Sequence, residues 1–203
     1  MRILLIITCL AFVTACTRSN KETATTGEEL EVSKSEIPEG VTIQPQTETD
    51  TLKGSLKAYA VGKIGGANFT VNYYSPATRG RMIWGGLVAY NNVWVTGAHK
   101  ATSIEFDKDI KIGETIVKAG KYAIFTIPGE DQWSIIINKN WNQHLADDYT
   151  EAEDVVRFQI TPEVNESHQE RLRYAIESES EAQGGIVMNW DKVEVAIPIL
   201  IVS

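Results

Sequence analysis

The sequence predicts an all-β fold, a single antiparallel β-sandwich with a jelly-roll-like arrangement of strands. Three observations lead to this prediction: apolar and polar residues alternate in short segments, tight turns separate these segments, and helical patterns are scarce. Alternation with a period of two is typical of strands with one buried face and one exposed face. Many short strands at regular spacing favour a sandwich or a barrel. The chain has 203 residues, 43% of them hydrophobic, which is enough for one core.

Five segments show the alternation clearly. Their apolar positions are Phe69, Val71 and Tyr73; Ile104 and Phe106; Val156, Phe158 and Ile160; Leu172, Tyr174 and Ile176; and Val193, Val195, Ile197 and Ile199. Two further segments, 122–127 and 133–138, are apolar on both faces, which predicts central strands. Pro198 predicts an edge or a bulge in the last strand, because proline has no N–H to donate to a neighbouring strand.

Turn residues separate these segments. Gly113 and Glu114 lie between two short apolar segments, which is the spacing of a two-residue hairpin. Pro128-Gly129-Glu130-Asp131 joins the two predicted central strands. A short piece at 141–148 is the best helical candidate. We therefore expect one β-sandwich domain over residues 52–203.

The first fifteen residues predict a lipoprotein signal peptide. Arg2 precedes an apolar stretch that is too short to span a bilayer. The stretch ends in Val13-Thr14-Ala15-Cys16, which resembles a lipobox, so we expect Cys16 to become the acylated N-terminus. Several acyl chains would give stable membrane anchoring. The expected location is the bacterial envelope, at the outer membrane facing the periplasm, with surface exposure as the alternative.

Residues 16–51 are predicted to form a flexible polar tether between the acylated cysteine and the domain. They contain no aromatic residue, so little apolar surface is present to offset the entropy of ordering. Asp50-Thr51-Leu52 resembles a short O-glycosylation acceptor motif, which makes Thr51 a candidate for modification; an ordinary linker is the alternative. Because Cys9 lies in the signal and Cys16 is acylated, neither a disulfide nor cysteine catalysis is expected.

Charge and motifs exclude several classes of function. The formal net charge is −8, and a broad nucleic-acid interface needs clustered Lys and Arg instead. The sequence has no Walker A loop, no dinucleotide-binding fingerprint and no Gly-x-Ser-x-Gly elbow. We therefore predict no cofactor. Composition identifies neither a protein partner nor an oligomeric state.

The segment 72–102 is the candidate for a ligand-binding site. It combines aromatic and cationic side chains with glycines, and such loops on a rigid sheet often carry sites. The candidates are Arg79, Arg81, Trp84, Tyr90, Trp94, His99 and Lys100, together with Trp141 from a later segment. Aromatic rings would suit a sugar, and two arginines would suit a carboxylate or phosphate. The alternative is that the tryptophans belong to the core and the arginines pair with surface acids.

Two histidines are candidates for catalysis. His99 lies in a glycine-containing turn beside Lys100, where an imidazole could act as a base or a ligand. His144 would share one helix face with Asp147 and Asp148 if that segment were helical. A structural or solvated role is the alternative for both histidines. No metal is predicted, because two protein ligands make a poor metal site.

Short blocks of residues, in order, also resemble a known family. They are Ser75-Pro76, Arg79-Gly80-Arg81, Gly85-Gly86-Leu87-Val88, Tyr90, Val93-Trp94, Thr96-Gly97-Ala98, Ala101-Thr102, Ala119-Gly120-Lys121-Tyr122, Phe125-Thr126-Ile127-Pro128-Gly129, Trp133, Asn138-Lys139, Trp141, Asp154-Val155 and Trp190. Over roughly residues 52–203 the chain resembles domain of unknown function 2911 (DUF2911), found mostly in Bacteroidota. The family usually shows Arg-Thr-Gly-Ala-Asn-Glu at positions 95–100, whereas this chain has Val95, His99 and Lys100 there. The resemblance implies a fold, secretion and a lineage, and it implies no mechanism.

Three functions follow as hypotheses. The first is a membrane-anchored, non-enzymatic module of the envelope that binds a small ligand, a carbohydrate or an anion. The second is a hydrolase that uses His99 or His144, with or without a metal. The third is a structural module that binds other envelope proteins.

Overall fold

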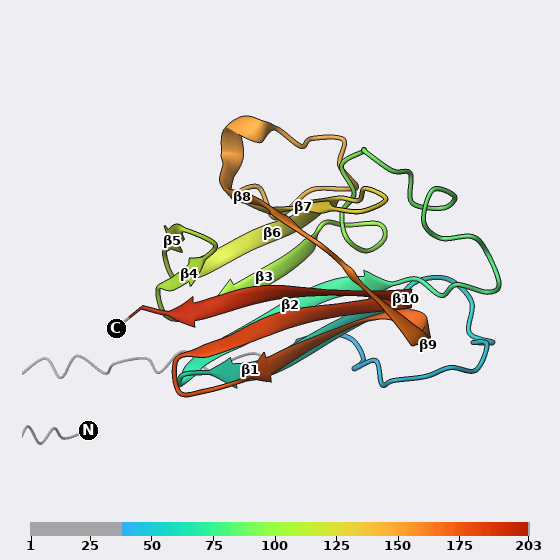
Figure 1. Ribbon diagram of the computed structural model, residues 1–203, viewed down its shortest axis with the longest axis horizontal. Coiled ribbons are helices and arrows are strands. Elements are labelled where there is room, and N and C mark those ends of the chain that lie inside the picture. Colours follow the sequence, from blue (N-terminus) through green and yellow to red (C-terminus); the bar gives the residue numbers. More distant parts are fainter. Residues whose placement is uncertain (1–37, 203) are drawn as a thin grey trace, which may run out of the picture. The chain divides into compact units, whose positions relative to one another are not determined.

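The computed structural model describes residues 38–202 (Figure 1). The predicted signal peptide and Cys16 lie outside the described residues. Within 38–202 there are ten strands and one short 3-10 helix. The strands are β1 (Leu56–Ile64), β2 (Ala67–Ser75), β3 (Thr102–Phe106), β4 (Ile110–Ile112), β5 (Thr115–Val117), β6 (Gly120–Ile127), β7 (Trp133–Asn138), β8 (Asp154–Ile160), β9 (Glu163–Ser178) and β10 (Gln183–Ile201), and the helix is η1 (Glu151–Glu153).

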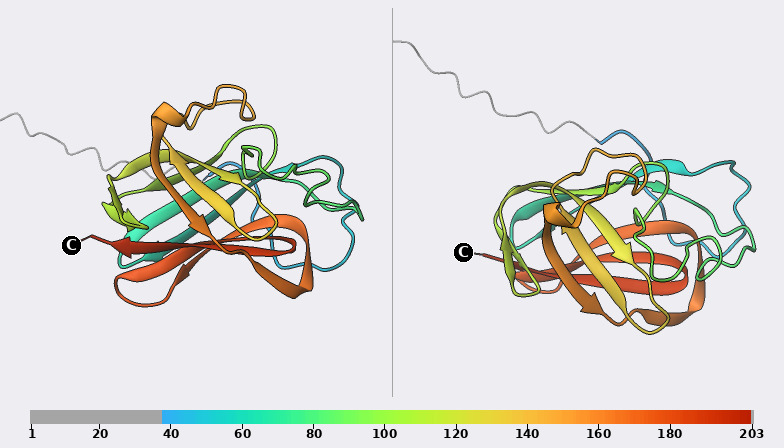
Figure 2. Two further views of the ribbon diagram at one scale, coloured as in Figure 1. Left: turned by 45° about the horizontal axis from the view of Figure 1, so that its top comes forward. Right: turned by 90° about the horizontal axis from the view of Figure 1, so that it is seen from above.

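The strands form two antiparallel sheets, and the predicted all-β sandwich is confirmed (Figures 1 and 2). One sheet has the order β1-β2-β3-β6-β7-β8, and the other has the order β5-β4-β10-β9. The alternating segments bury one face: Phe69, Val71 and Tyr73 of β2 lie in the core, whereas Thr70 and Asn72 are half-buried. The main core therefore lies between the two sheets.

The two segments that are apolar on both faces are the central strands β6 and β7, as predicted. Their outer face is buried as well, because a loop covers it. Phe125 of β6 and Ile136 of β7 form a second small core with Val95 and Ala101 of the loop that precedes β3. This packing places the loop 91–101 firmly on the outside of the six-stranded sheet.

Gly113 and Pro198 both lie at breaks in the strand pairing, where their backbone properties matter. Gly113 joins β4 to β5 with φ 58, and Ile112 pairs with Thr115, so the two-residue hairpin is confirmed. Pro198 lies between the part of β10 that pairs with β9 and the part that pairs with β4, where β10 has no ladder partner among the described strands. That position fits a residue without a backbone N–H.

The predicted helix at 141–148 is wrong, because these residues form turns. Leu145 has φ 51, which a helix does not accommodate. The segment instead bonds to the loop before β3: Ala101 donates its N–H to the Gln143 carbonyl at 3.1 Å, and Leu145 donates to the His99 carbonyl at 2.7 Å. These bonds to a distant segment replace the hydrogen bonds of a helix.

The structure also differs from the sequence prediction over the last part of the predicted tether. Residues 41–54, which we call the strap, lie against the domain, and Ile43 is 9% exposed. The strap passes the same end of the sandwich as the loop between β2 and β3 (Figures 1 and 2). The strap contacts the domain mostly through backbone groups and through Asp50. The prediction of a flexible tether counted only apolar side chains, so it did not include these polar contacts. Among residues 38–202, no helix has the length and apolar character that crossing a bilayer requires.

Candidate functional site

Trp84 and Trp94, predicted to bind a ligand, lie in a cluster with Trp133 and Trp190. The ring centroids of Trp84 are 4.8 Å from those of Trp133 and 5.7 Å from those of Trp190, and Trp94 stacks on Trp190 at 5.8 Å. Trp133 and Trp190 are fully buried, and the other two rings pack against the core. The structure therefore favours the core interpretation of these tryptophans, and their contact with a ligand stays a prediction.

Among the described residues, Tyr90 and Trp141 form no aromatic pair with the tryptophan cluster. Tyr90 is half-buried against Gly85, where a Cβ atom would come within 2.8 Å of the tyrosine ring. Trp141 is 40% exposed, and the Lys121 ammonium lies 4.2 Å from its ring centroid. Trp141 thus makes a cation–π contact on the outer face of the six-stranded sheet.

His99, Lys100 and His144 come together on that same outer face. Lys100 and His144 form an isolated antiparallel bridge, and the exposed His99 ring meets Tyr74 edge-on at 5.1 Å. The carboxylate nearest to His144 belongs to Asp147, at 3.9 Å, and both side chains are largely exposed. Among residues 38–202, neither imidazole bonds to a hydroxyl or a carboxylate within 3.5 Å. The pair has the exposure of a surface site, and catalysis by either histidine stays a prediction.

Arg79 and Arg81 lie at the end of the sandwich, on the turn that follows β2. Arg81 donates from Nε to the Thr78 carbonyl at 3.0 Å and from Nη2 to the Ala77 carbonyl at 2.5 Å. Arg79 has φ 49, and its Nη2 donates to the Leu52 carbonyl. Both side chains are exposed, and neither forms an ion pair with any carboxylate in residues 38–202.

Beside these arginines lies a polar cluster that the sequence did not predict, centred on His168 of β9. His168 Nδ1 lies 3.1 Å from Asp191 Oδ1, and Nε2 lies 3.1 Å from Glu170 Oε2. Thr78 Oγ1 lies 3.3 Å from the same Nε2 and donates to Glu170. An irregularity in the pairing of β10 with β9 and a φ of 54 at Asp191 direct that carboxylate to the imidazole.

Glu170 is ionised inside this cluster. Its side chain is 2% exposed, and burial alone would raise its pKa. Hydrogen bonds from Thr78 and His168, and from the backbone N–H groups of Arg79 and Asp50, together outweigh burial and hold the Glu170 pKa below its usual value. The cluster therefore keeps the Glu170 carboxylate charged at neutral pH, bonded to the backbone N–H of Arg79.

The cluster does not have the geometry of a metal site. The two nitrogens of His168 point to different carboxylates, so His168, Glu170 and Asp191 cannot all face one ion. In the part of the chain that the structure describes, no group of three or more His, Cys, Asp or Glu side chains is arranged to hold one metal ion. The residues fit a hydrogen-bond network rather than a metal centre.

His168, Glu170 and Arg171 were not among the candidate residues selected from the sequence. The run His168-Gln169-Glu170-Arg171 lies in the middle of β9, and its last three residues are buried. A run of polar residues has the pattern of an exposed segment. No local signal marks it as buried, since its partners come from residues 44–54 and 75–79 and from Asp191.

The family of the chain can be stated from residues 55–199. These residues match the sequence profile of a family described as "Protein of unknown function (DUF2911)". The chain belongs to this family. The match begins one residue before β1 and ends within β10, so the DUF2911 domain includes both sheets, the tryptophan cluster and His168. No curated protein and no solved structure matches the chain.

Proposed function

We propose that this DUF2911 protein is a lipid-anchored, non-enzymatic binding module of the bacterial envelope, and that it binds a small anionic ligand through Arg79 and Arg81. One observation carries the proposal. Two exposed arginines lie on one turn, and no carboxylate of the described residues neutralises either of them. The chain as a whole has a net charge of −8, so an exposed pair of positive charges without ion-pair partners among the described residues differs from the rest of its surface.

The backbone around the arginines supports a preformed site. Thr78 donates its N–H to the Glu170 carbonyl at 2.8 Å, and Arg81 donates its N–H to the Thr78 carbonyl at 3.0 Å. Two donor atoms of the Arg81 guanidinium already bind carbonyls, which orients its remaining N–H groups. Orientation before binding reduces the entropy lost on binding a carboxylate or phosphate.

The proposal can be tested with inorganic phosphate and citrate as probes. Residues 17–203 would be followed by thermal shift and calorimetry at constant ionic strength. We expect a saturable rise in melting temperature with the probe concentration, as mass action requires. The rise should be lost in the Arg79→Gln, Arg81→Gln double variant and kept in Lys63→Gln, which removes an exposed charge elsewhere. An equal rise in the double variant, or no rise with either probe, would contradict anion binding at this turn.

The anchoring part of the proposal rests on the lipobox-like residues that end at Cys16. Cells that express the full chain would be labelled with a radioactive fatty acid. Label should enter the wild-type protein and should be absent from Cys16→Ser, which should also leave the membrane fraction. Separation of inner and outer membranes, with protease treatment of whole cells, would then test the outer membrane and its periplasmic face.

A second candidate function, binding to another envelope protein, is favoured by apolar side chains on the same loop. Met82 and Leu87 are 75% and 49% exposed, and exposed apolar groups of this kind often mark protein contacts. A photo-crosslinker at position 82 should then capture a defined partner in cells, whereas one at the exposed Val61 should not. Equal capture at both positions would remove this candidate.

A further inference from the structure

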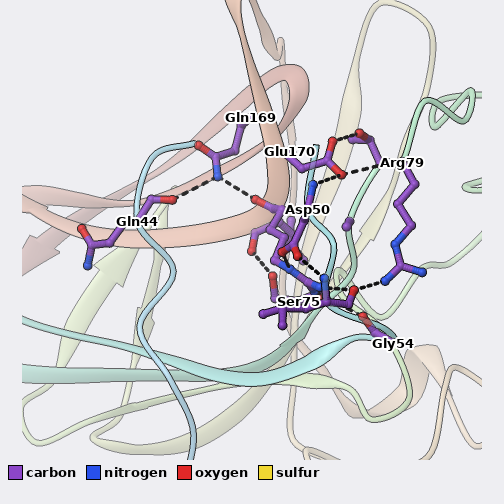
Figure 3. Close-up of polar contacts among 12 residues, drawn as sticks. Gln44, Asp50, Gly54, Ser75, Arg79, Gln169 and Glu170 are labelled. Carbon is purple, nitrogen blue, oxygen red and sulfur yellow. Dashed lines mark hydrogen bonds and ion pairs between the residues drawn. The ribbon is translucent and has the colours of Figure 1, made fainter. Parts of the chain in front are cut away.

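We infer that the DUF2911 domain contains a binding site for an extended peptide that carries an aspartate, and that the strap, residues 41–54, occupies this site within the same chain. The site lies between the two sheets' edge strands β1 and β9 and is centred on Arg171. It borders the proposed anion site, because the Arg79 guanidinium also donates to the Leu52 carbonyl of the strap. The two proposals are therefore tested with different probes, a peptide for one and free anions for the other. Figure 3 shows the strap residues Gln44, Asp50 and Gly54 beside residues of β2 and β9.

Most of the hydrogen-bond acceptors around the buried Arg171 side chain belong to the strap. The Arg171 side chain is 1% exposed, and it makes four hydrogen bonds. Three of them go to the strap: Nε donates to the Asp50 carboxylate, Nη2 to the Leu52 carbonyl at 3.0 Å, and Nη1 to the Gly54 carbonyl at 3.3 Å. Only the Ser75 carbonyl, at 2.7 Å, belongs to the domain.

A buried guanidinium with a single acceptor would be strongly unfavourable, because a buried charge needs a partner charge and further hydrogen bonds. Without the strap, Arg171 would keep one protein acceptor, and a ligand that supplies one carboxylate and several carbonyl groups would restore the other three hydrogen bonds. A peptide with an aspartate has both. The match to the family begins at residue 55, so all three strap partners lie outside the shared domain, whereas Arg171 lies inside it.

The domain also holds the backbone of the strap in the way that peptide-binding domains hold extended ligands. Val41 pairs with β1 at its open edge: Val41 N–H donates to the Lys57 carbonyl, and Tyr59 N–H donates to the Val41 carbonyl, both at 3.0 Å. Further along, Glu170 N–H of β9 donates to the Gln46 carbonyl at 2.9 Å. β1 is the outermost strand of its sheet, and such an edge accepts an added strand. β9 is outermost in the other sheet, but Arg171 is already bridged to Ala77, so the strap adds only the bond from Glu170 N–H to the backbone there.

Side chains of β9 complete this recognition. The Gln169 amide accepts from Gln46 N–H at 3.3 Å and donates to the Gln44 carbonyl at 3.4 Å. The Glu170 carboxylate accepts from Asp50 N–H at 3.3 Å. These contacts bind backbone groups of the peptide, whereas Arg171 binds the carboxylate of Asp50. Specificity would therefore depend on an aspartate at the position of Asp50.

The fit of the strap is incomplete, which leaves room for exchange. Gln46 Nε2 is buried and makes no hydrogen bond within 3.5 Å in the described part of the chain, although it lies near enough to Asp50 to help lower the pKa of that carboxyl. A buried, unsatisfied amide weakens an interaction. The strap is held because it is joined to the domain, which raises its effective concentration at the site. A peptide with the same aspartate and a better-satisfied neighbour would compete with it.

The test separates the strap from the domain after folding. A recognition sequence for a site-specific protease is inserted between Gly54 and Ser55 of residues 17–203, and the folded protein is cleaved. A fluorescent synthetic peptide of residues 41–54 is then added, and its anisotropy is measured. The matched probes are the same peptide with Asp50→Asn and with Glu48→Gln, because the Glu48 side chain is exposed and makes no hydrogen bond or ion pair among residues 38–202.

We expect saturable binding of the wild-type peptide and of the Glu48→Gln peptide, and binding at least about tenfold weaker for Asp50→Asn, as loss of a buried charged hydrogen bond implies. Circular dichroism of the cleaved protein should be unchanged. Equal binding of all three peptides, failure of the peptide to enter the cleaved protein, or unfolding on cleavage would overturn the inference, and the strap would be a fixed part of the domain. Because Arg79 also contacts Leu52, the peptide assay is carried out without phosphate or citrate, and its outcome is then distinct from that of the anion test.

Discussion

Asp50 and Arg171 form an ion pair across 121 residues of sequence, with 9% of the Asp50 side chain and 1% of the Arg171 side chain exposed. The Arg171 guanidinium lowers the pKa of Asp50, since its hydrogen bond favours the charged carboxylate. The pair joins the segment before the family domain to the centre of β9. Removal of this ion pair should therefore affect both the stability of the domain and the binding of the strap.

Removal of the carboxylate should destabilise the domain. Asp50→Ala leaves Arg171 buried without its counter-charge, and we expect a loss of about 3 kcal/mol in the free energy of unfolding. Urea unfolding of residues 17–203 would measure it. Glu48→Ala is the control, with an expected change within about 0.5 kcal/mol because that residue is exposed. Equal stability of the two variants would show that the pair does not contribute.

Acid should weaken the fold partly through Glu170. Its pKa in the folded protein is lowered, so its contribution is complete above the unfolded-state value of about 4.3 and is lost as the pH falls through the folded-state pKa. Glu170→Gln should therefore lose stability less steeply than wild type on acidification below about pH 4.3. Urea midpoints measured at a series of acidic pH values would check this, and parallel profiles would contradict it.

The tryptophan cluster should be a stability element. Trp133→Ala removes a ring that is 2% exposed, and we expect a loss of about 3–5 kcal/mol. Trp141→Ala removes a ring that is 40% exposed, and its effect should be about 1 kcal/mol or less. Denaturation followed by far-UV circular dichroism would compare the two variants without relying on tryptophan emission. Similar losses would mean that the cluster packs less tightly than its ring distances indicate.

The β4–β5 hairpin should depend on backbone conformation at Gly113. Its φ is 58, and a Cβ atom there would meet only ordinary contacts, with Phe158 at 3.8 Å. Gly113→Ala should therefore lose about 1–2 kcal/mol through conformational strain alone. Gly113→Asn should lose less, because asparagine tolerates the left-handed region. Thermal unfolding would rank the three proteins, and an asparagine variant less stable than the alanine variant would exclude this explanation.

Local patterns were sufficient to predict much of the fold. Alternation located β2 through Phe69 and Val71, and apolar runs on both faces located β6 and β7 as central strands. Each of these signals is a property of neighbouring residues in one segment. The helix predicted at 141–148 was wrong because its hydrogen bonds go to residues 99–101, and no local pattern contains that information.

The candidate site was predicted less completely. Arg79 and Arg81 were selected from the sequence, because a segment that combines arginines, aromatic residues and glycines is typical of a loop that carries a site. Their neighbours His168 and Glu170 were missed, since they lie about ninety residues away. Trp84 and Trp94 were selected as ligand-binding residues, but an aromatic ring has the same sequence signature in a core and in a site.

The sequence by itself determined the fold class, the central strands, the hairpin at Gly113 and the resemblance that the family match confirmed. These follow from side-chain periodicity and turn chemistry, which act over a few residues. Only the tertiary structure decided that the four tryptophans pack together, that a polar run in β9 is buried, and that residues 41–54 close over it. Burial of a charge such as Arg171 depends on a partner brought from elsewhere in the chain, and that partner is fixed only when the sheets have assembled.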